Sequence, residues 1–259
     1  MKLYKILAVV AAILIGVVYF QPIWWVALQS HQYPKDMYPK GIRIEFKFNG
    51  VYNGCEGVKE REELATSEGA DCLVEMNAIN HYIGMYHVVQ GMNRDKGRDY
   101  PVYYVFNTEK DANGIEVIDP STGKPKVVDV TPGFLKFLDK VMYLSPFLLG
   151  LLIIMALIFA FTSKKVLGFF AIIPALFPFY FLGMYIYGLY WYGHHLGLHG
   201  GGAFAGIKPF MPTVFGEGKV AQFSTISYPY FGFFLALAVF VLMILALLMK
   251  KKSLKNARA

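Results

Sequence analysis

Four long apolar runs constrain the fold of this chain more than any other feature of its sequence. None of the runs contains Asp, Glu, Lys or Arg, and each is about as long as the ~20 residues that cross ~30 Å of hydrocarbon, or longer. They are Ile6–Tyr19 with an extension through Ile23–Leu28, Val141–Phe161, Val166–Trp191 and Tyr228–Met249. The sequence therefore predicts an α-helical membrane protein with four transmembrane helices.

The first run follows Lys2 and Lys5, as the apolar part of a secretory signal peptide would. It is longer than that part usually is, however, and no pair of small residues follows it to mark a cleavage site. We interpret residues 1–28 as a retained transmembrane anchor. Trp24 and Trp25 would then lie at the outer face of the bilayer, because aromatic rings accumulate at membrane interfaces.

Basic residues are distributed asymmetrically among the segments outside the four runs. The N-terminal tip, the turn at 162–165 and the tail at 250–259 carry nine basic and no acidic residues, which predicts that all three face the cytoplasm. Residues 29–140 carry 14 basic and 17 acidic residues. The net charge of +7 thus reflects topology, and we expect a lipid bilayer and no nucleic acid as partner. The predicted location is a bacterial inner (plasma) membrane.

Residues 29–140 have the composition of a small soluble domain, and we expect them to form an extracytoplasmic α+β domain. In Ile42–Phe48 apolar residues alternate with charged ones, which is the period of a half-buried strand. The other elements expected in this domain are strands at Tyr100–Phe106, Ile115–Ile118 and Lys126–Val130, and one or two helices between Val58 and Tyr86.

The rest of the chain is predicted to return to the membrane. Residues 141–249 would form three transmembrane helices with a His- and Gly-rich outer loop at 193–227, and residues 250–259 a basic cytoplasmic tail. Pro174 and Pro178 should bend the third span.

Both cysteines, Cys55 and Cys72, lie in the predicted outer domain and hence in an oxidising compartment. A structural disulfide is one interpretation, and it would close a 16-residue segment and contribute about 3 kcal/mol to stability. The alternative is a thiol pair that binds a metal or exchanges electrons, although the spacing lacks the Cys-x-x-Cys form.

All six histidines lie outside the predicted cytoplasmic segments, and three candidate metal ligands cluster at His81, Met85 and His87. If a helix continues to Met85, then Asn77, His81 and Met85 share one face. Imidazole and thioether ligands suit copper, above all Cu(I), while an axial His/Met pair would suit haem iron. The alternative is that Met76, Ile79 and Ile83 are core residues, while His81 and Asn80 cap the helix or hydrogen-bond nearby backbone.

A second cluster, His194, His195 and His199, lies where the third span is expected to leave the membrane. His195 and His199 are four residues apart, the spacing of paired metal ligands on one helix face. The glycines that follow could bring the segment back towards the outer domain, so both clusters could form one metal site. Alternatively, these histidines only anchor the span at the interface.

Several motifs of catalytic sites are missing, among them the Walker-type glycine loop, Cys-x-x-Cys-His, Gly-x-Ser-x-Gly and His-Glu-x-x-His. The hydrocarbon cores of the predicted spans contain no ionisable side chains, which argues against coupled transport. We therefore expect an accessory role rather than a catalytic one.

The sequence Asn-His-Tyr-Ile-Gly-Met at Asn80–Met85, after a cysteine pair and before a His-rich exit from a later span, resembles small membrane proteins of the NosB type, which some bacteria encode beside nitrous oxide reductase. The resemblance implies an accessory role in copper-dependent respiration: assembly of a metalloenzyme, copper delivery or electron supply. Its partners would be other membrane or periplasmic respiratory proteins. The alternatives are a structural subunit of a respiratory or monooxygenase complex, and a thiol- or quinol-dependent oxidoreductase that uses the cysteines.

Overall fold

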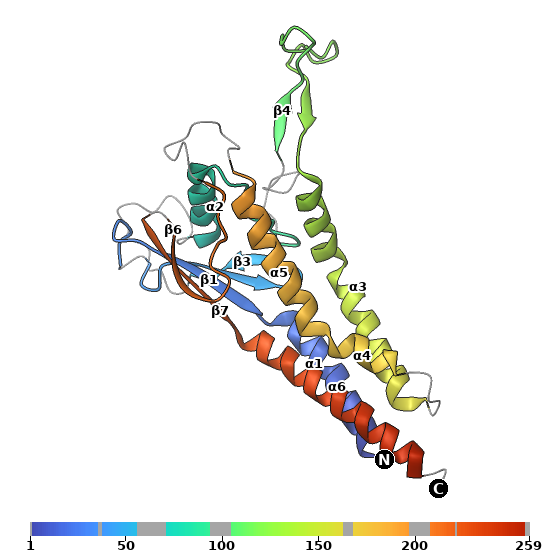
Figure 1. Cartoon of the computed structure of the whole chain (residues 1–259). Helices are drawn as coiled ribbons and strands as arrows, with labels where there is room; N and C mark the ends of the chain where they lie inside the picture. Colours follow the sequence, from blue (N-terminus) through green and yellow to red (C-terminus); the bar gives the residue numbers. More distant parts are fainter. Residues whose placement is uncertain are drawn as a thin grey trace, which may run out of the picture.

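The computed structural model describes residues 2–35, 38–55, 71–93, 105–162, 168–196, 208–220 and 222–256. Within these residues, three helices are long and apolar enough to cross a membrane: α1 (Leu3–Phe20), α3 (Gly133–Phe161) and α6 (Phe231–Asn256). Helix α3 begins eight residues before the predicted span, and its first turns lie beside the part of the molecule that carries the sheet (Figure 1).

A fourth candidate span consists of two helices, α4 (Phe169–Ala175) and α5 (Phe177–His194), which meet at an angle of 45°. Pro174 lies within α4 and Pro178 in the first turn of α5. Neither proline can donate a backbone hydrogen bond, so the helix breaks between them. The predicted bend is confirmed, and the protein is a multi-pass membrane protein with three spans, or four if the bent pair crosses as one.

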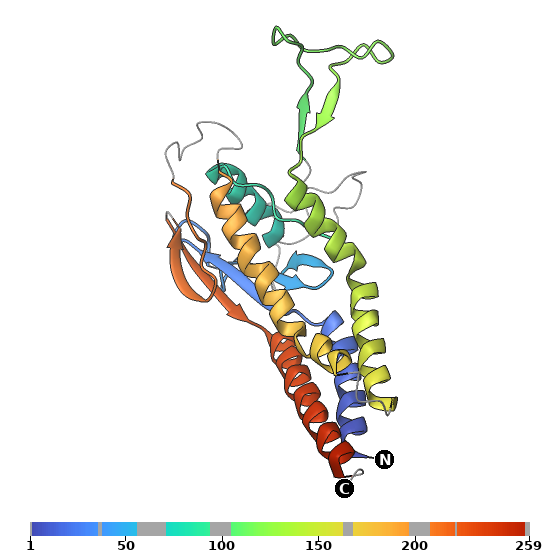
Figure 2. The same cartoon turned by 45° about the vertical axis from the view of Figure 1, so that its right-hand side comes forward.

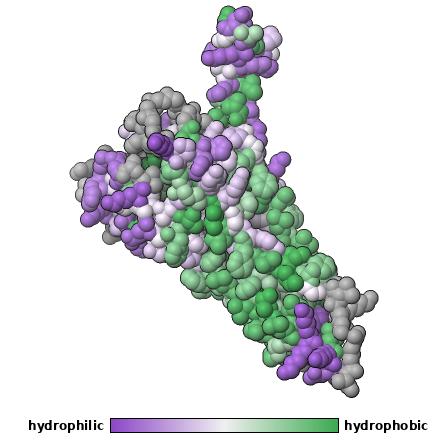
Figure 3. Space-filling model, viewed as in Figure 1, coloured by the Kyte–Doolittle hydropathy of each residue, from purple (hydrophilic) through white to green (hydrophobic). Residues whose placement is uncertain are grey.

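Helix α1 packs between α3 and α6, and its buried side includes Ala8, Ala11 and Ala12. Such small residues let neighbouring helix backbones approach closely. The two ends of the chain lie at the same end of this bundle, where the Lys2 ammonium donates to the Ser253 hydroxyl at 3.4 Å. Figure 3 shows an apolar surface over the helices, with hydrophilic surface at the sheet and at the end of α6.

At the other end of the bundle is a five-stranded antiparallel sheet in the order β3-β2-β1-β7-β6. The strands are β1 (Trp24–Gln29), β2 (Ile42–Lys47), β3 (Gly50–Asn53), β6 (Gly216–Val220) and β7 (Phe223–Pro229). Strand β2 confirms the strand predicted from alternating residues. Helix α2 and the outer half of α5 lie over one face of the sheet (Figures 1 and 2).

The expectation that Ile23–Leu28 extends the first span is wrong, because this stretch forms the central strand β1. The Trp24 indole N–H donates to the Ser227 hydroxyl at 2.9 Å, and β1 pairs with β7 over its whole length. Strand β1 has a neighbour on each side, so its backbone groups are paired as fully as those of a helix would be. The loop expected at 193–227 likewise contains β6 and part of β7.

Helix α2 (Cys72–Ile83) lies within the segment where helices were predicted. The Asp71 carboxylate caps its first turn by accepting hydrogen bonds from the N–H groups of Leu73 at 2.9 Å and Val74 at 3.4 Å. Cys72 at the first turn forms a disulfide with Cys55, which follows β3. The disulfide interpretation of the two cysteines is confirmed, and the bond ties α2 to the edge of the sheet.

A second, two-stranded sheet of β4 (Phe106–Thr108) and β5 (Val127–Asp129) projects from the body as an arm, here defined as residues 105–131 (Figures 1 and 2). Strand β5 confirms the strand predicted at Lys126–Val130. Of the strand predicted at Tyr100–Phe106, residues 100–104 lie outside the described residues. Residues 115–118 contribute isolated bridges instead of a strand.

Candidate functional site

The segment that carries the first histidine cluster does not form one continuous helix. Helix α2 ends at Ile83, and Gly84 adopts a left-handed conformation (φ 84°) while its N–H donates to the His81 carbonyl at 3.0 Å. Glycine is favoured at this position because it lacks the Cβ that opposes positive φ. The expectation of a helix that continues to Met85 and places it on the face of Asn77 and His81 is therefore wrong.

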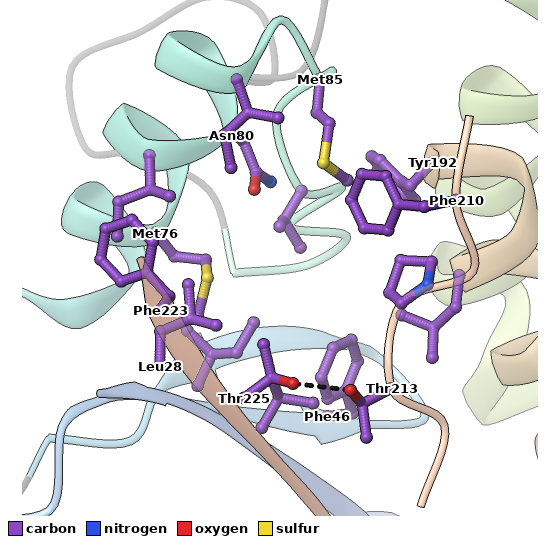
Figure 4. A pocket seen from close by; sticks show the side chains of 17 residues that line it. Leu28, Phe46, Met76, Asn80, Met85, Tyr192, Phe210, Thr213, Phe223 and Thr225 are labelled. Carbon is purple, nitrogen blue, oxygen red and sulfur yellow. Dashed lines mark hydrogen bonds between the residues drawn. The ribbon is translucent and has the colours of Figure 1, made fainter. Parts of the chain in front are cut away.

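Beyond Gly84, the chain turns Met85 into the protein interior. Its side chain points into a cavity, as that of Met76 does, and the residue is 8% exposed (Figure 4). The Asn77 side-chain oxygen accepts a hydrogen bond from the Val88 N–H at 2.8 Å and so holds the returning chain against α2. His81, by contrast, is exposed, so the thioethers and the imidazole of this cluster face different surroundings.

The same turn brings His81 and His87 together. Their ring centroids are 6.2 Å apart, with an angle of 59° between the ring planes. An ion bound by one nitrogen of each ring, at about 2.0 Å, would hold the two ring centres about 6 Å apart if the rings approached it from opposite sides. The observed separation therefore fits two imidazole ligands of one ion.

The second cluster occupies the end of α5. The Nδ1 atoms of His194 and His195 lie 2.8 Å from the carbonyl oxygens of Tyr190 and Trp191, respectively. A carbonyl oxygen can only accept, so each Nδ1 carries the hydrogen, and in the neutral ring the lone pair is on Nε2. This is the tautomer that second-shell carbonyls fix in metal-binding histidines. His199 lies outside the described residues.

The two histidine-bearing segments lie against each other. The Tyr192 hydroxyl donates to the His87 carbonyl at 3.0 Å and accepts from the Val89 N–H at 3.1 Å. The Tyr86 ring lies 5.3 Å from that of Trp191, on which the His195 ring stacks. No three His, Cys, Asp or Glu side chains gather as a ready ligand set within the described residues. The two segments are thus in contact, while the single metal site expected from both clusters stays a prediction.

Next to this junction, an apolar cavity of about 130 Å³ lies between the sheet, α2 and α5 (Figure 4). Its few polar groups have partners within the protein. The Thr213 and Thr225 hydroxyls are 2.6 Å apart, and the Asn80 amide donates to the Tyr86 carbonyl at 3.3 Å. We call this space the upper cavity; its wall offers mainly hydrocarbon, aromatic rings and the two thioethers.

A second apolar cavity, of about 230 Å³, lies between α3, α5 and the end of β2, and we call it the lower cavity. Phe46 and Leu189 line both cavities, so the two spaces are neighbours. The Ser145 hydroxyl in its wall donates to the Met142 carbonyl of the same helix at 2.7 Å and offers no donor to a ligand. Apart from Lys47, Tyr180 and Tyr185, the other side chains in the wall of the lower cavity are apolar.

A third hollow, of about 360 Å³, is polar and lies beside β1 and β7, with His31, Tyr33 and Tyr38 in its wall. Burial raises the pKa of the Tyr33 and Tyr38 phenols above the ordinary value, and the negative charge of Glu75 adds to this effect. Both phenols therefore stay protonated at neutral pH.

The sequence did not predict the upper cavity, because part of its wall comes from β1 and β7, which were assigned to membrane spans and a loop. The lower cavity escaped prediction because the packing of α3 and α5 against the end of β2 is a long-range contact. The contact of Tyr192 with the chain after α2 was missed as well. The sequence did contain a signal for the end of α2, because a glycine such as Gly84 often terminates a helix. A helix that ends there places Met85 outside the helix that carries His81.

In comparisons with known proteins, no family model, no curated protein sequence and no solved structure matched the chain.

Proposed function

We propose that this protein is a non-catalytic membrane accessory protein that binds copper at the outer face and serves assembly of, or electron delivery to, a respiratory metalloenzyme. The approach of the His81 and His87 rings to 6.2 Å carries the proposal. His194 and His195 on the adjoining helix end also present Nε2 lone pairs, but within the described residues they do not gather with His81 and His87 into one ligand set. Haem is the alternative cofactor, but Met85 is turned away from the histidines and into the upper cavity.

The coordination chemistry favours Cu(I) over zinc. A structural zinc site uses four ligands and usually includes thiolates, whereas both cysteines here are joined in a disulfide. Imidazole is a good copper ligand, and Cu(I) accepts low coordination numbers. Two imidazoles on an exposed turn would hold such an ion while leaving room for a partner's ligands, as transfer requires.

Two features support the assignment of the sheet to the outer side of the membrane. The disulfide between Cys55 and Cys72 is typical of oxidising compartments. The lysine-rich ends of α1 and α6 lie at the opposite end of the bundle, as expected if they are retained in the cytoplasm.

The proposal is tested by Cu(I) binding to the full-length protein in mild detergent, measured against a chromogenic chelator. One Cu(I) should bind per chain, and His81→Ala with His87→Ala should weaken binding by about a hundredfold. His31→Ala is the matched control, because His31 lies beside the polar hollow and not in either cluster. A variant that combines His81→Ala, His87→Ala, His194→Ala and His195→Ala is measured as well. If it binds Cu(I) with unchanged affinity, this site is ruled out.

The arm favours a second function, that of a structural subunit in a larger membrane complex. Ile115, Ile118 and Val127 on the arm are 64%, 52% and 60% exposed. A two-stranded hairpin without a core of its own is only marginally stable in water, so a partner that covers these side chains would stabilise it.

The subunit function predicts copurifying chains in fixed stoichiometry. Ile115→Ser with Ile118→Ser should release those chains without changing the Tm of the protein itself, because neither side chain packs against the body. Lys124→Ser, at an exposed polar position of the same arm, should leave the complex intact. Recovery of the protein alone under the mildest extraction would argue against this function.

A further inference from the structure

We infer that the lower and upper cavities together form a binding site for one acyl chain of a membrane phospholipid, which enters sideways from the bilayer between α3 and α5. The inference is independent of copper binding and starts from the position of the lower cavity. Its wall is built from α3 and α5, two helices that belong to candidate membrane spans.

The lower cavity is open towards the surroundings of the helices. Leu148 of α3 and Tyr180 of α5 both line it, and each is 46% exposed on the outer surface. The two helices diverge towards the sheet (Figures 1 and 2). In a membrane, the medium at this opening is hydrocarbon, so the cavity is filled by lipid chains in preference to water.

The upper cavity extends this apolar path beyond the membrane-spanning part. Only the side chains of Phe46 and Leu189 are shared by the two walls, and Phe46 also lies edge-on to Tyr185, with ring centroids 5.3 Å apart. At the far end are the thioethers of Met76 and Met85 (Figure 4). Methionine side chains adjust their shape easily and are common where a binding surface must adapt to flexible apolar ligands.

The chemistry of the walls selects a hydrocarbon chain instead of a polar ring. The threonine hydroxyls and the Asn80 amide already bond within the protein, so a quinone head group would find few hydrogen-bond partners in the upper cavity. Lys47 also lines the lower cavity, but its ammonium lies over the Tyr52 ring, 4.8 Å from the ring centroid, and is not directed at a ligand in the cavity. A hydrocarbon chain thus fits inside the two cavities, and the lipid head group stays outside them.

Photocrosslinking tests the inference. The full chain is reconstituted into vesicles of phosphatidylethanolamine and phosphatidylglycerol that contain a phospholipid with a diazirine at the end of one acyl chain. After irradiation, mass spectrometry should find the label on α2 residues of the upper cavity, such as Met76 and Ile79. A parallel experiment uses an isoprenoid chain with the same photoreactive group.

Two glycines of α5 provide a matched pair of variants. A Cβ at Gly188 or at Gly183 would have no neighbour within 4 Å, so both positions accept a side chain. Gly188 lines the lower cavity, whereas Gly183 is exposed and lines neither cavity. Gly188→Leu should reduce labelling of α2 by roughly tenfold, and Gly183→Leu should leave it unchanged.

The proposal is overturned if the label stays on outward-facing residues such as Phe147 and Leu151, if Gly188→Leu leaves α2 labelling unchanged, or if only the isoprenoid probe reaches α2. The Tm of Gly188→Leu should equal or exceed that of the parent protein, because leucine fills space and favours helix. If this variant fails to fold, Ser145→Leu fills the same cavity from α3 and should give the same loss of labelling.

Discussion

The hydroxyl of Tyr192 donates a 3.0 Å hydrogen bond to the backbone carbonyl of His87, and this bond joins the last turn of α5 to the chain that returns from α2. The same oxygen accepts the Val89 N–H at 3.1 Å. Tyr192 thus holds the returning segment from one side, while the Asn77 side chain holds it from α2 through the Val88 N–H.

Tyr192→Phe should therefore lower stability by about 1–3 kcal/mol, because it leaves a buried N–H and a carbonyl without their partner. Amide hydrogen exchange of residues 85–89 should become faster, which hydrogen–deuterium exchange mass spectrometry measures. Tyr187→Phe is the control on the same helix, since Tyr187 is 51% exposed, and it should have little effect. Equal exchange in parent and variant would contradict this role of Tyr192.

The disulfide should stabilise the part of the molecule outside the spans. Cys55→Ala with Cys72→Ala should cost about 3 kcal/mol, because the bond closes a 16-residue segment in the unfolded chain. Thermal unfolding in detergent measures the loss. Equilibration with thiol buffers tests the oxidoreductase alternative: a structural bond should reduce only below about −300 mV, and reduction at a clearly higher potential would favour a redox role.

The base of the arm should respond to acid. The Lys136 ammonium lies 2.7 Å from the Asp129 carboxylate, and with hydrogen bonds from Thr131 it lowers the pKa of Asp129 to about 2. A pKa below the ordinary value of 3.8 means that the carboxylate stabilises the folded arm above pH ~4 and that this contribution is lost as the pH falls towards 2.

Both side chains are partly exposed, so the pair should contribute at most about 1 kcal/mol. At the base of the arm, Asp129→Asn should remove the acid dependence of amide exchange between pH 4 and 2, and Lys136→Met should reduce it, because the Thr131 hydrogen bonds to Asp129 remain. An acid response that persists in both variants would have to come from other carboxylates.

Topology can be tested with fusions. Alkaline phosphatase inserted at the Thr122–Gly123 turn of the arm should be active, because the enzyme needs an oxidising compartment. A fluorescent protein at the C-terminus should fold and fluoresce, since the basic tail is expected in the cytoplasm. The opposite pattern would place the sheet and its histidines in the cytoplasm.

The elements that the sequence predicts well are those whose signal is local. The spans of α1 and α6 follow from uncharged length, β2 from strict alternation at Ile42–Phe48, and the bend before α5 from Pro174 and Pro178. Each of these signals acts within a few neighbouring residues, so no long-range contact is needed to interpret it.

Strand β1 could not be predicted in the same way. A central strand and a membrane helix both bury apolar side chains, and Trp24–Gln29 reads as either one. The Trp24 indole of β1 donates its hydrogen bond to Ser227, which is 203 residues away in the sequence, and no local pattern reveals that pairing. The cavities border this sheet, so they escaped prediction for the same reason. The approach of the two histidine segments was expected, but its anchor, Tyr192, was not.

The central position of β1 also sets an order of events during synthesis. Helix α1 and β1 leave the ribosome early, yet one edge of β1 has no partner until β7 has been made. The sheet can therefore be completed only after β7 has emerged, just before α6. Until then, the unpaired edge of β1 is a site at which the nascent protein can aggregate or be recognised by a chaperone.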